Sequence, residues 1–154
     1  MKVLLSTDGS EFSEAAVEAL KNFRFPAGSE IRIISVLDMS VELSLDENAG
    51  RLKSAAEIEN AAREKIRKIL SETKGKIAAY VSSEDVTINT ELLDGDPKSR
   101  IIEKALEMSA DLIVIGSHGY NSWERFLLGS VSDSVVRHAQ CSVLLVRKRE
   151  NRIS

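Results

Sequence analysis

The chain has little of several residue types, and each shortage limits what the protein can be. Cys141 is the only cysteine, which excludes an internal disulfide, and its small apolar neighbours indicate a packed residue rather than a reactive thiol. No apolar run approaches the length of a membrane-spanning helix, about 20 residues. Asp8 interrupts the apolar N-terminal run before it reaches the length of a signal sequence. The net charge of −3 provides no basic stripe for a nucleic acid. We therefore expect a cytoplasmic protein that binds neither membranes nor nucleic acids.

What the sequence does contain is a regular alternation of short apolar runs and amphipathic segments. Apolar runs rich in Val, Ile and Leu are typical of buried strands, and a segment in which apolar and polar residues alternate is typical of an edge strand. The predicted strands are 3–6, 31–37, 86–92 (the edge strand), 112–115 and 142–146. Residues 38–48 are expected to form a loop before a long helix that starts at about Ala49 and continues through Gly75. The order βαβαβαβαβ predicts an α/β fold in a single domain, residues 1–154, with helices on both faces of a parallel sheet.

Glycines gather in one connection, between the predicted strand 112–115 and an expected helix from Ser130 to His138. Gly116-Ser117-His118-Gly119 follows the strand, and Gly129-Ser130 precedes the helix. Glycine lets the main chain approach an anion without a Cβ in the way. The first amides of a helix have no partner inside the helix and attract anions. Each glycine alone is ordinary, but the set, with the Ser130 and Ser132 hydroxyls, predicts a phosphate-binding connection.

A second polar segment, Thr7-Asp8-Gly9-Ser10, follows the first predicted strand. In open parallel sheets, ligands bind beyond the carboxyl ends of the strands. If the first and fourth strands are neighbours, Asp8 faces the glycine-rich connection. Because a carboxylate repels phosphate, we expect Asp8 to meet the hydroxyl or amino end of a nucleotide, or to help hold a metal. The alternative is that Asp8 only caps the next helix, with Glu11 completing a capping box, although Ser10 could also serve as the cap.

These residues also carry a family likeness. The pattern G-x2-G-x9-G-[ST] resembles the ATP-binding signature of the universal stress protein family. The residues that fill it are Gly116, Gly119, Gly129 and Ser130. The likeness covers nearly the whole chain, since residues 3–10 resemble the opening strand and turn of the family and 129–146 resemble its ending. Gly-Asp-Pro at 95–97 resembles a helix start that recurs in the family. The resemblance implies a Rossmann-like open parallel sheet of five strands in the order 3-2-1-4-5.

The resemblance further implies ATP in the crevice, accompanied by Mg²⁺ or Mn²⁺. It places the adenosine near Asp8 and Val36, and the ribose and phosphates against the glycine-rich connection. The residues implied to bind the nucleotide are Thr7, Asp8, Val36, Gly116, Ser117, Gly119, Gly129, Ser130, Val131 and Ser132. It also implies a homodimer, which we expect to form through the last strand, 142–146, because that strand is apolar on both faces and would be an association hazard at a sheet edge. The role implied is a nucleotide-dependent regulatory or stress-response protein with a protein partner that the sequence does not identify.

Three functions remain open at this stage. The connection 116–130 lacks the lysine of a Walker loop, so we assign no catalytic residue and expect at most slow hydrolysis. Arg125 either reaches a phosphate or lies in solvent, and His118 is a positional residue. We expect Trp123, Phe126 and Leu127 to pack the connection onto the body of the protein or onto a partner rather than to stack on a base. The alternative is a weak ATPase or nucleotidyl-transfer enzyme on the same fold.

A phospho-receiver is the third possibility. It would need paired acids after the first strand, an Asp after the third and a Lys after the fifth. Asp94 and Lys148 fit superficially, but Asp8 has no adjacent acid and the glycines would be unexplained.

Overall fold

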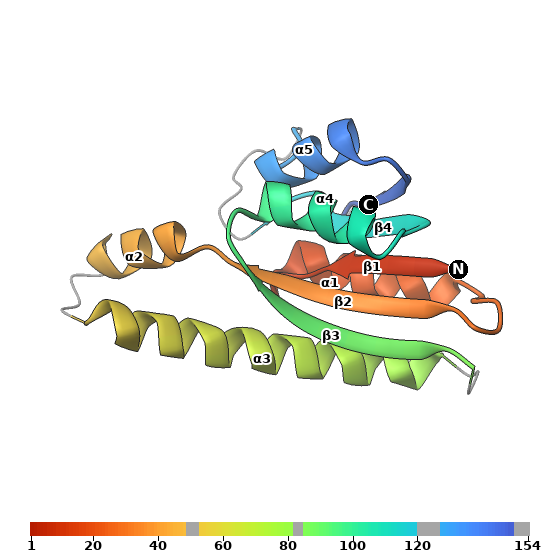
Figure 1. The fold of residues 1–154 in the computed structure, drawn as a ribbon, viewed down its shortest axis with the longest axis horizontal. Helices are drawn as coiled ribbons and strands as arrows, with labels where there is room; N and C mark the ends of the chain where they lie inside the picture. The colour runs from red at the N-terminus through yellow and green to blue at the C-terminus, as the bar shows by residue number, and fades with distance from the viewer. Residues whose placement is uncertain (49–52, 82–84, 120–126, 150–154) are drawn as a thin grey trace, which may run out of the picture.

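The computed structural model describes residues 1–48, 53–81, 85–119 and 127–149. Its centre is a parallel five-stranded sheet in the order β3-β2-β1-β4-β5 (Figure 1). The strands are β1 (Lys2–Ser6), β2 (Glu30–Leu37), β3 (Thr87–Asp94), β4 (Leu112–Gly116) and β5 (Ser142–Val146). The α/β class, the strand order and the edge position of the third strand are therefore confirmed.

Helices cover both faces of the sheet, also as predicted. Figure 1 shows α3 below the sheet and α4 and α5 above it. The helices are α1 (Glu11–Ala19), a short 3₁₀ turn η1 (Leu20–Asn22), α2 (Met39–Asn48), α3 (Ala55–Tyr80), α4 (Pro97–Glu107) and α5 (Ser130–His138). Within the described ranges, none of these helices is both long enough and apolar enough to cross a membrane.

Alternation along the central strands divides the core into two layers. Val3 and Leu5 of β1 point to the layer under α1 and α3, whereas Leu4 points to the layer under α4 and α5. All three side chains are fully buried. The edge strand β5 divides in the same way, since Leu144 packs against the first layer and Val143 against the second. Strands that are apolar on both faces are what a sheet covered on both sides requires.

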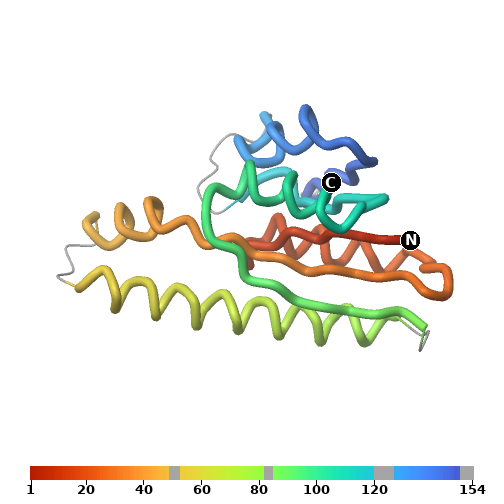
Figure 2. Tube along the Cα trace, in the orientation of Figure 1, coloured from red at the N-terminus to blue at the C-terminus, as the bar shows by residue number. Residues whose placement is uncertain are grey.

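The segment after β2 differs from the prediction. Residues 38–48 are not a loop, because α2 occupies Met39–Asn48. Asp38 starts this helix, since its Oδ1 accepts the Ser40 amide at 3.0 Å. No residue of α2 is buried, so the helix leaves no apolar stripe of helical period in the sequence. Figure 2 shows the chain running out through α2 and back along α3, beyond the carboxyl ends of the strands.

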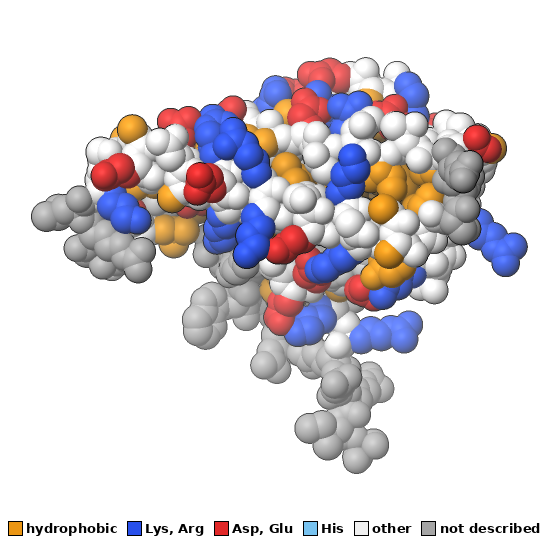
Figure 3. Space-filling view, turned by 90° about the horizontal axis from the view of Figure 1, so that it is seen from below, with side chains coloured by type: hydrophobic (Ala, Val, Ile, Leu, Met, Phe, Trp, Pro, Cys, Tyr) orange, Lys and Arg blue, Asp and Glu red, His pale blue; other side chains and the backbone are white. Residues whose placement is uncertain are grey.

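The long helix is also shorter at its start than predicted. It begins at Ala55 rather than near Ala49, after a capping box in which Ser54 accepts the Glu57 amide and the Glu57 carboxylate accepts the Ser54 amide. The predicted passage through Gly75 is confirmed, since α3 continues to Tyr80. Lysine, arginine and acidic side chains are interspersed on the surface seen from the α3 side (Figure 3).

The strand order also bears on the phospho-receiver hypothesis. Asp94 ends β3, which β2 separates from β1 and Asp8. Its carboxylate pairs with Arg63 of α3, and Lys148 pairs with Glu11. The residues that such a protein would bring together are therefore apart and engaged elsewhere.

Candidate functional site

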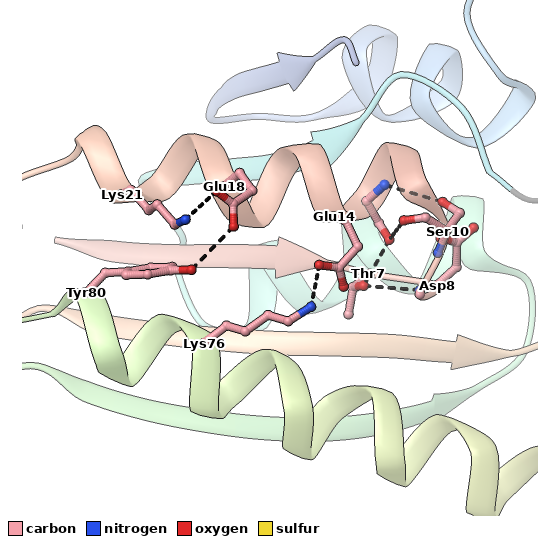
Figure 4. Close-up of polar contacts among 10 residues, drawn as sticks. Thr7, Asp8, Ser10, Glu14, Glu18, Lys21, Lys76 and Tyr80 are labelled. Atoms are coloured by element: carbon pink, nitrogen blue, oxygen red, sulfur yellow. Dashed lines mark hydrogen bonds and ion pairs between the residues drawn. The ribbon is translucent and has the colours of Figure 1, made fainter. Parts of the chain in front are cut away.

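The turn after β1 is held by its own hydroxyls (Figure 4). The buried Thr7 hydroxyl donates to Ser13 Oγ at 3.0 Å and accepts the Gly9 amide at 3.2 Å. Ser10 is the N-cap of α1 and accepts the Ser13 amide at 3.3 Å. Asp8 Oδ1 accepts the Ser10 amide at 2.9 Å, while the residue stays exposed. Ser10, not Asp8, therefore caps the helix, and the Asp8 carboxylate orders the turn and remains open to solvent.

The two ends of the connection from β4 to α5 are joined by hydrogen bonds to one carbonyl oxygen. Ser117 O accepts the Gly129 amide at 2.9 Å and the Ser132 hydroxyl at 2.7 Å. The Ser117 amide is bonded in turn to Val146 O of β5. The two ends of the connection are thereby fixed to each other and to the sheet. The predicted roles of Trp123, Arg125 and Phe126 lie outside the described residues. Leu127 is described and is 62% exposed, so it is not packed onto the body of the single chain.

The three glycines of this connection have different neighbours. A Cβ on Gly116 would lie 2.6 Å from Phe12 O, so glycine is needed there for the packing of β4 against α1. A Cβ on Gly129 would lie 3.2 Å from His118 Cα, where the two ends of the connection meet. A Cβ on Gly119 would lie 2.9 Å from Asp8 Oδ2. The structure thus brings the β1 turn and the β4 connection into contact.

The N-terminus of α5 opens toward the same place. Gly129 occupies the N-cap position, and none of the described side chains caps the helix. Ser130 is the first helical residue and is exposed, whereas Ser132 is buried. The first amides of a helix have no acceptor within the helix and carry the positive end of its dipole. This end of α5 can therefore hold an anion through its main chain.

A cleft of about 1000 Å³ lies beyond the carboxyl ends of the strands. Its volume is at the upper end of the usual range for small-molecule sites, about 300–1000 Å³. Every residue predicted to bind the nucleotide lines this cleft, except Ser117. Ser117 is buried behind the connection that it closes. The hydroxyls of Thr7 and Ser132 also have partners within the protein. These three residues are therefore placed to hold the walls of the cleft in position rather than to contact a ligand directly.

Sequence reasoning missed the side of the cleft formed by α2, α3 and α4. Val41 and Leu45 of α2 line it, although both are exposed at the surface. The additional lining residues of α3 and α4 include Ala62, Lys65, Ile66, Ile69, Pro97, Lys98 and Ile101. The spacing of Val41 and Leu45, four residues apart, was the available signal, but the alternating apolar residues of this segment concealed it.

His118 is half-buried and lines the cleft, and its ring is held by neighbours in the connection and in α1. Its Nδ1 lies 2.9 Å from Ser117 Oγ, and its ring centroid lies 5.1 Å from that of Phe12. Its Nε2 is buried, with no hydrogen-bond partner in the part of the chain that the structure describes. This placement supports the positional role predicted from the sequence.

We also searched the described residues for a cluster of metal ligands and for a reactive thiol. Among the described residues, no three His, Cys, Asp or Glu side chains are grouped so that they could hold a metal ion. A smaller cavity of about 230 Å³ lies between α4 and the loop before β5, lined by Leu106 and Cys141 among others. Burial raises the pKa of the Cys141 thiol, in keeping with a packed residue.

Comparison with known proteins gives one consistent result. The universal stress protein family matches residues 1–147. A universal stress protein of Methanocaldococcus jannaschii is 34% identical over 148 residues, which cover 96% of this chain and 82% of the relative. The solved structure of hypothetical protein MJ0577 has a TM-score of 0.79 at 25% identity and 97% coverage of both chains. A universal stress protein solved in complex with cAMP has a TM-score of 0.63 at 25% identity, with 95% of each chain covered.

Proposed function

Because the chain belongs to the universal stress protein family, we propose that it binds an adenine nucleotide in the cleft beyond the sheet. The nucleotide proposed is ATP with Mg²⁺ or Mn²⁺. The residues proposed to contact it are Asp8, Val36, Gly116, Gly119, Gly129, Ser130 and Val131, supported by Thr7, Ser117 and Ser132. The relative solved with cAMP supports an adenine nucleotide as the class of ligand.

The observation that carries this proposal is the chemical division of the cleft. One side presents the glycine-rich connection and the uncapped start of α5, which together suit phosphate oxygens. The other side presents apolar side chains of α2 and α3, including Val41, Ile66 and Ile69, which suit a flat base. A mononucleotide has this same division between an anionic end and an apolar ring. The donors and the space in the cleft therefore fit the group.

The function proposed is binding and regulation rather than rapid catalysis. The connection 116–130 contains no lysine, and phosphoryl-transfer sites usually supply one to the phosphates. Lys65 and Lys98 line the cleft from α3 and α4, outside the connection. We propose that bound nucleotide changes the surface around the cleft, which a protein partner in the cytoplasm recognises. A weak ATPase remains the alternative, and turnover that Asp8→Ala abolishes in pure protein would favour it.

The proposed assembly is a homodimer through β5. This strand is the outer strand on its side of the sheet, and Val143 to Val146 are all half-buried in the single chain. An open edge of this kind favours pairing with a second copy. Light scattering should give twice the chain mass of 17.0 kDa. A monomer at tens of micromolar protein would contradict this part of the proposal.

Titration calorimetry with ATP and Mg²⁺ tests the binding site. Gly129→Val places a branched side chain against His118 Cα, so ATP affinity should fall by about tenfold or more because the connection must move. Gly75→Val is the matched control, since no atom of the residues that the structure describes comes within 4 Å of the added Cβ on α3. No binding at millimolar ATP by the unsubstituted protein would overturn the proposed function. Equal affinities for the two variants would place the site elsewhere.

A further inference from the structure

Helix α2 is anchored to the body of the protein at its first turn. The Met39 side chain packs against the first layer of the core, and Asp38 Oδ1 accepts the Ser40 amide at 3.0 Å. Beyond this turn the helix contacts α3, and all of its residues are at least partly exposed. Figure 1 shows α2 to the left of the sheet, beyond the carboxyl ends of the strands. One end of the helix is therefore fixed, and the other end lies outside the core.

The sequence of α2 gives the helix little stability of its own. It has 10 residues, and isolated helices shorter than about 12–15 residues are marginal in water. Asp46 and Glu47 lie in its last turn, where acidic side chains oppose the helix dipole. A helix of this kind is stabilised mostly by the packing of its apolar face. The docking of α2 therefore depends on what its apolar side chains contact.

Two of those side chains face the cleft. Val41 and Leu45, one helical turn apart, line it together with Ile66 and Ile69 of α3. Val41 is 38% exposed and Leu45 is 50% exposed, so water still reaches both. Removing this apolar surface from water is favourable. A flat base held between α2 and α3 would cover it and would supply the packing that α2 otherwise lacks.

Resting on the function proposed above, we propose that α2 is a lid whose docking is coupled to occupation of the cleft. With nucleotide bound, Val41 and Leu45 pack on the base and α2 keeps the helical arrangement of the structure. Without nucleotide, residues 43–48 exchange between this arrangement and open, unwound forms. The docked helix presents Leu43, which is 37% exposed and is not among the residues that line the cleft, on its outer side. Helix α2 is thereby the part of the surface that reports whether the cleft is occupied.

Charge offers a competing account of how a nucleotide would act on α2. Asp38 and Glu42 line the cleft from the α2 side. Lys65 and Lys98 line it from α3 and α4. A bound phosphate can shift these charged side chains and move α2 as a rigid helix. The two accounts differ because only coupled docking makes nucleotide affinity depend on the helix propensity of α2.

The experiment changes helix propensity in α2 at a position outside the cleft. Ser44 lies in the middle of α2, is exposed and is not among the residues that line the cleft. Because glycine disfavours a helix relative to alanine, Ser44→Gly should bind ATP with Mg²⁺ about four- to fivefold more weakly than Ser44→Ala in titration calorimetry. The thermal midpoints of these two variants without nucleotide should be equal, because α2 opens before the rest of the fold.

Ser71 provides the matched control, since it is exposed in the interior of α3 and also lies outside the cleft lining. The expected pattern is the reverse of that at Ser44. Ser71→Gly should have a lower thermal midpoint than Ser71→Ala, and the two variants should bind ATP equally.

Hydrogen exchange of the unsubstituted protein tests the same inference without a variant. In the absence of nucleotide, the amides of residues 43–48 should exchange much faster than those in the interior of α3, and ATP with Mg²⁺ should slow them. Protection of α2 equal to that of α3 without nucleotide overturns the coupling. Equal ATP affinity of Ser44→Gly and Ser44→Ala overturns it as well, while the proposed function stands. No ATP binding by the unsubstituted protein contradicts the proposed function, and the role of α2 falls with it.

Discussion

Gly116 ends β4 at a point where the main chain of α1 leaves no room for a side chain. Its Cβ would lie 2.6 Å from Phe12 O and 2.7 Å from Phe12 C, both backbone atoms that side-chain rotation cannot move. Gly116→Ala should therefore destabilise the fold by about 1–3 kcal/mol, the usual range for overpacking. Urea unfolding measures this change. An unchanged midpoint would show that α1 can shift to make room for a side chain. The glycine would then be needed for ligand binding rather than for packing.

Glu91 joins three elements through its two oxygens. Oε2 accepts from Arg32 of β2 at 3.0 Å, and Oε1 pairs with Lys104 of α4 at 2.9 Å. Burial raises the pKa of Glu91, but the bonds from Lys104 and Arg32 outweigh burial and leave the pKa below its ordinary value of 4.5. Because the folded pKa is the lower one, the pair stabilises the fold above pH 4.5, and this contribution is lost as pH falls through the folded value.

Glu91→Gln should consequently cost about 1–2 kcal/mol at pH 7, the range for a partly buried charge-assisted bond. Its stability should also fall less steeply with acid than that of the unsubstituted protein. Glu72→Gln is the matched control, because its contact with Lys68 is 3.9 Å long and exposed, and it should change stability by less than about 0.5 kcal/mol. Denaturant curves at several pH values measure both, and equal effects of the two variants would contradict a special role for Glu91.

At the scale of elements, α3 carries a glycine in its interior for which the structure shows no packing reason. In the described part of the chain, nothing lies within 4 Å of a Cβ at Gly75, and the backbone there is helical. Gly75→Ala should stabilise the protein by about 0.5–1 kcal/mol, since alanine loses less backbone entropy on folding. Gly28→Ala provides the contrast, with equal space but a φ of +78°, and should destabilise the protein. Thermal unfolding of both variants checks the pair, and a lower midpoint for Gly75→Ala would show a constraint on α3 beyond its local packing.

The elements also show where sequence patterns succeed and where they do not. Four of the strands were predictable from dense apolar runs, and the edge strand β3 from its alternation of apolar and polar residues. Helix α4 was predictable because Asp96 caps it and Pro97 opens it. Helix α2 was not predictable from an apolar stripe, because it buries none. The Ser54–Glu57 capping box marks the start of α3. The apolar residues upstream of it led to the prediction of an earlier start.

At the scale of the whole molecule, the part of the site built from strand ends was predictable from the chain alone. Parallel strands bring their carboxyl ends to one edge, so Asp8 and Gly119 had to approach each other once β1 and β4 were neighbours. The wall formed by α2 and α3 depends on how the two helices fold back over that edge. The spacing of Val41 and Leu45 is compatible with a helix, but no local pattern encodes the path that brings this helix and Ile69 of α3 to the cleft.

Strand ends and helices from both faces of the sheet line the cleft, so a ligand there should stabilise the fold as a whole. At a hundredfold excess over its dissociation constant, a ligand adds about 2.7 kcal/mol, which corresponds to roughly 5–10 °C for a chain of this size. Thermal melts with ATP and Mg²⁺ measure that shift.

Hydrogen exchange then locates the ligand. We expect added protection in α2, in the turn at Asp8 and in the first turn of α5, because these line the cleft from separate elements. The smaller cavity near Leu106 and Cys141 is lined by the second half of α4 and the segment before β5, away from these three places, and serves as the internal control. Protection confined to that cavity, together with a thermal shift, would mean that the nucleotide binds between α4 and β5 and that the glycine-rich connection serves the fold alone.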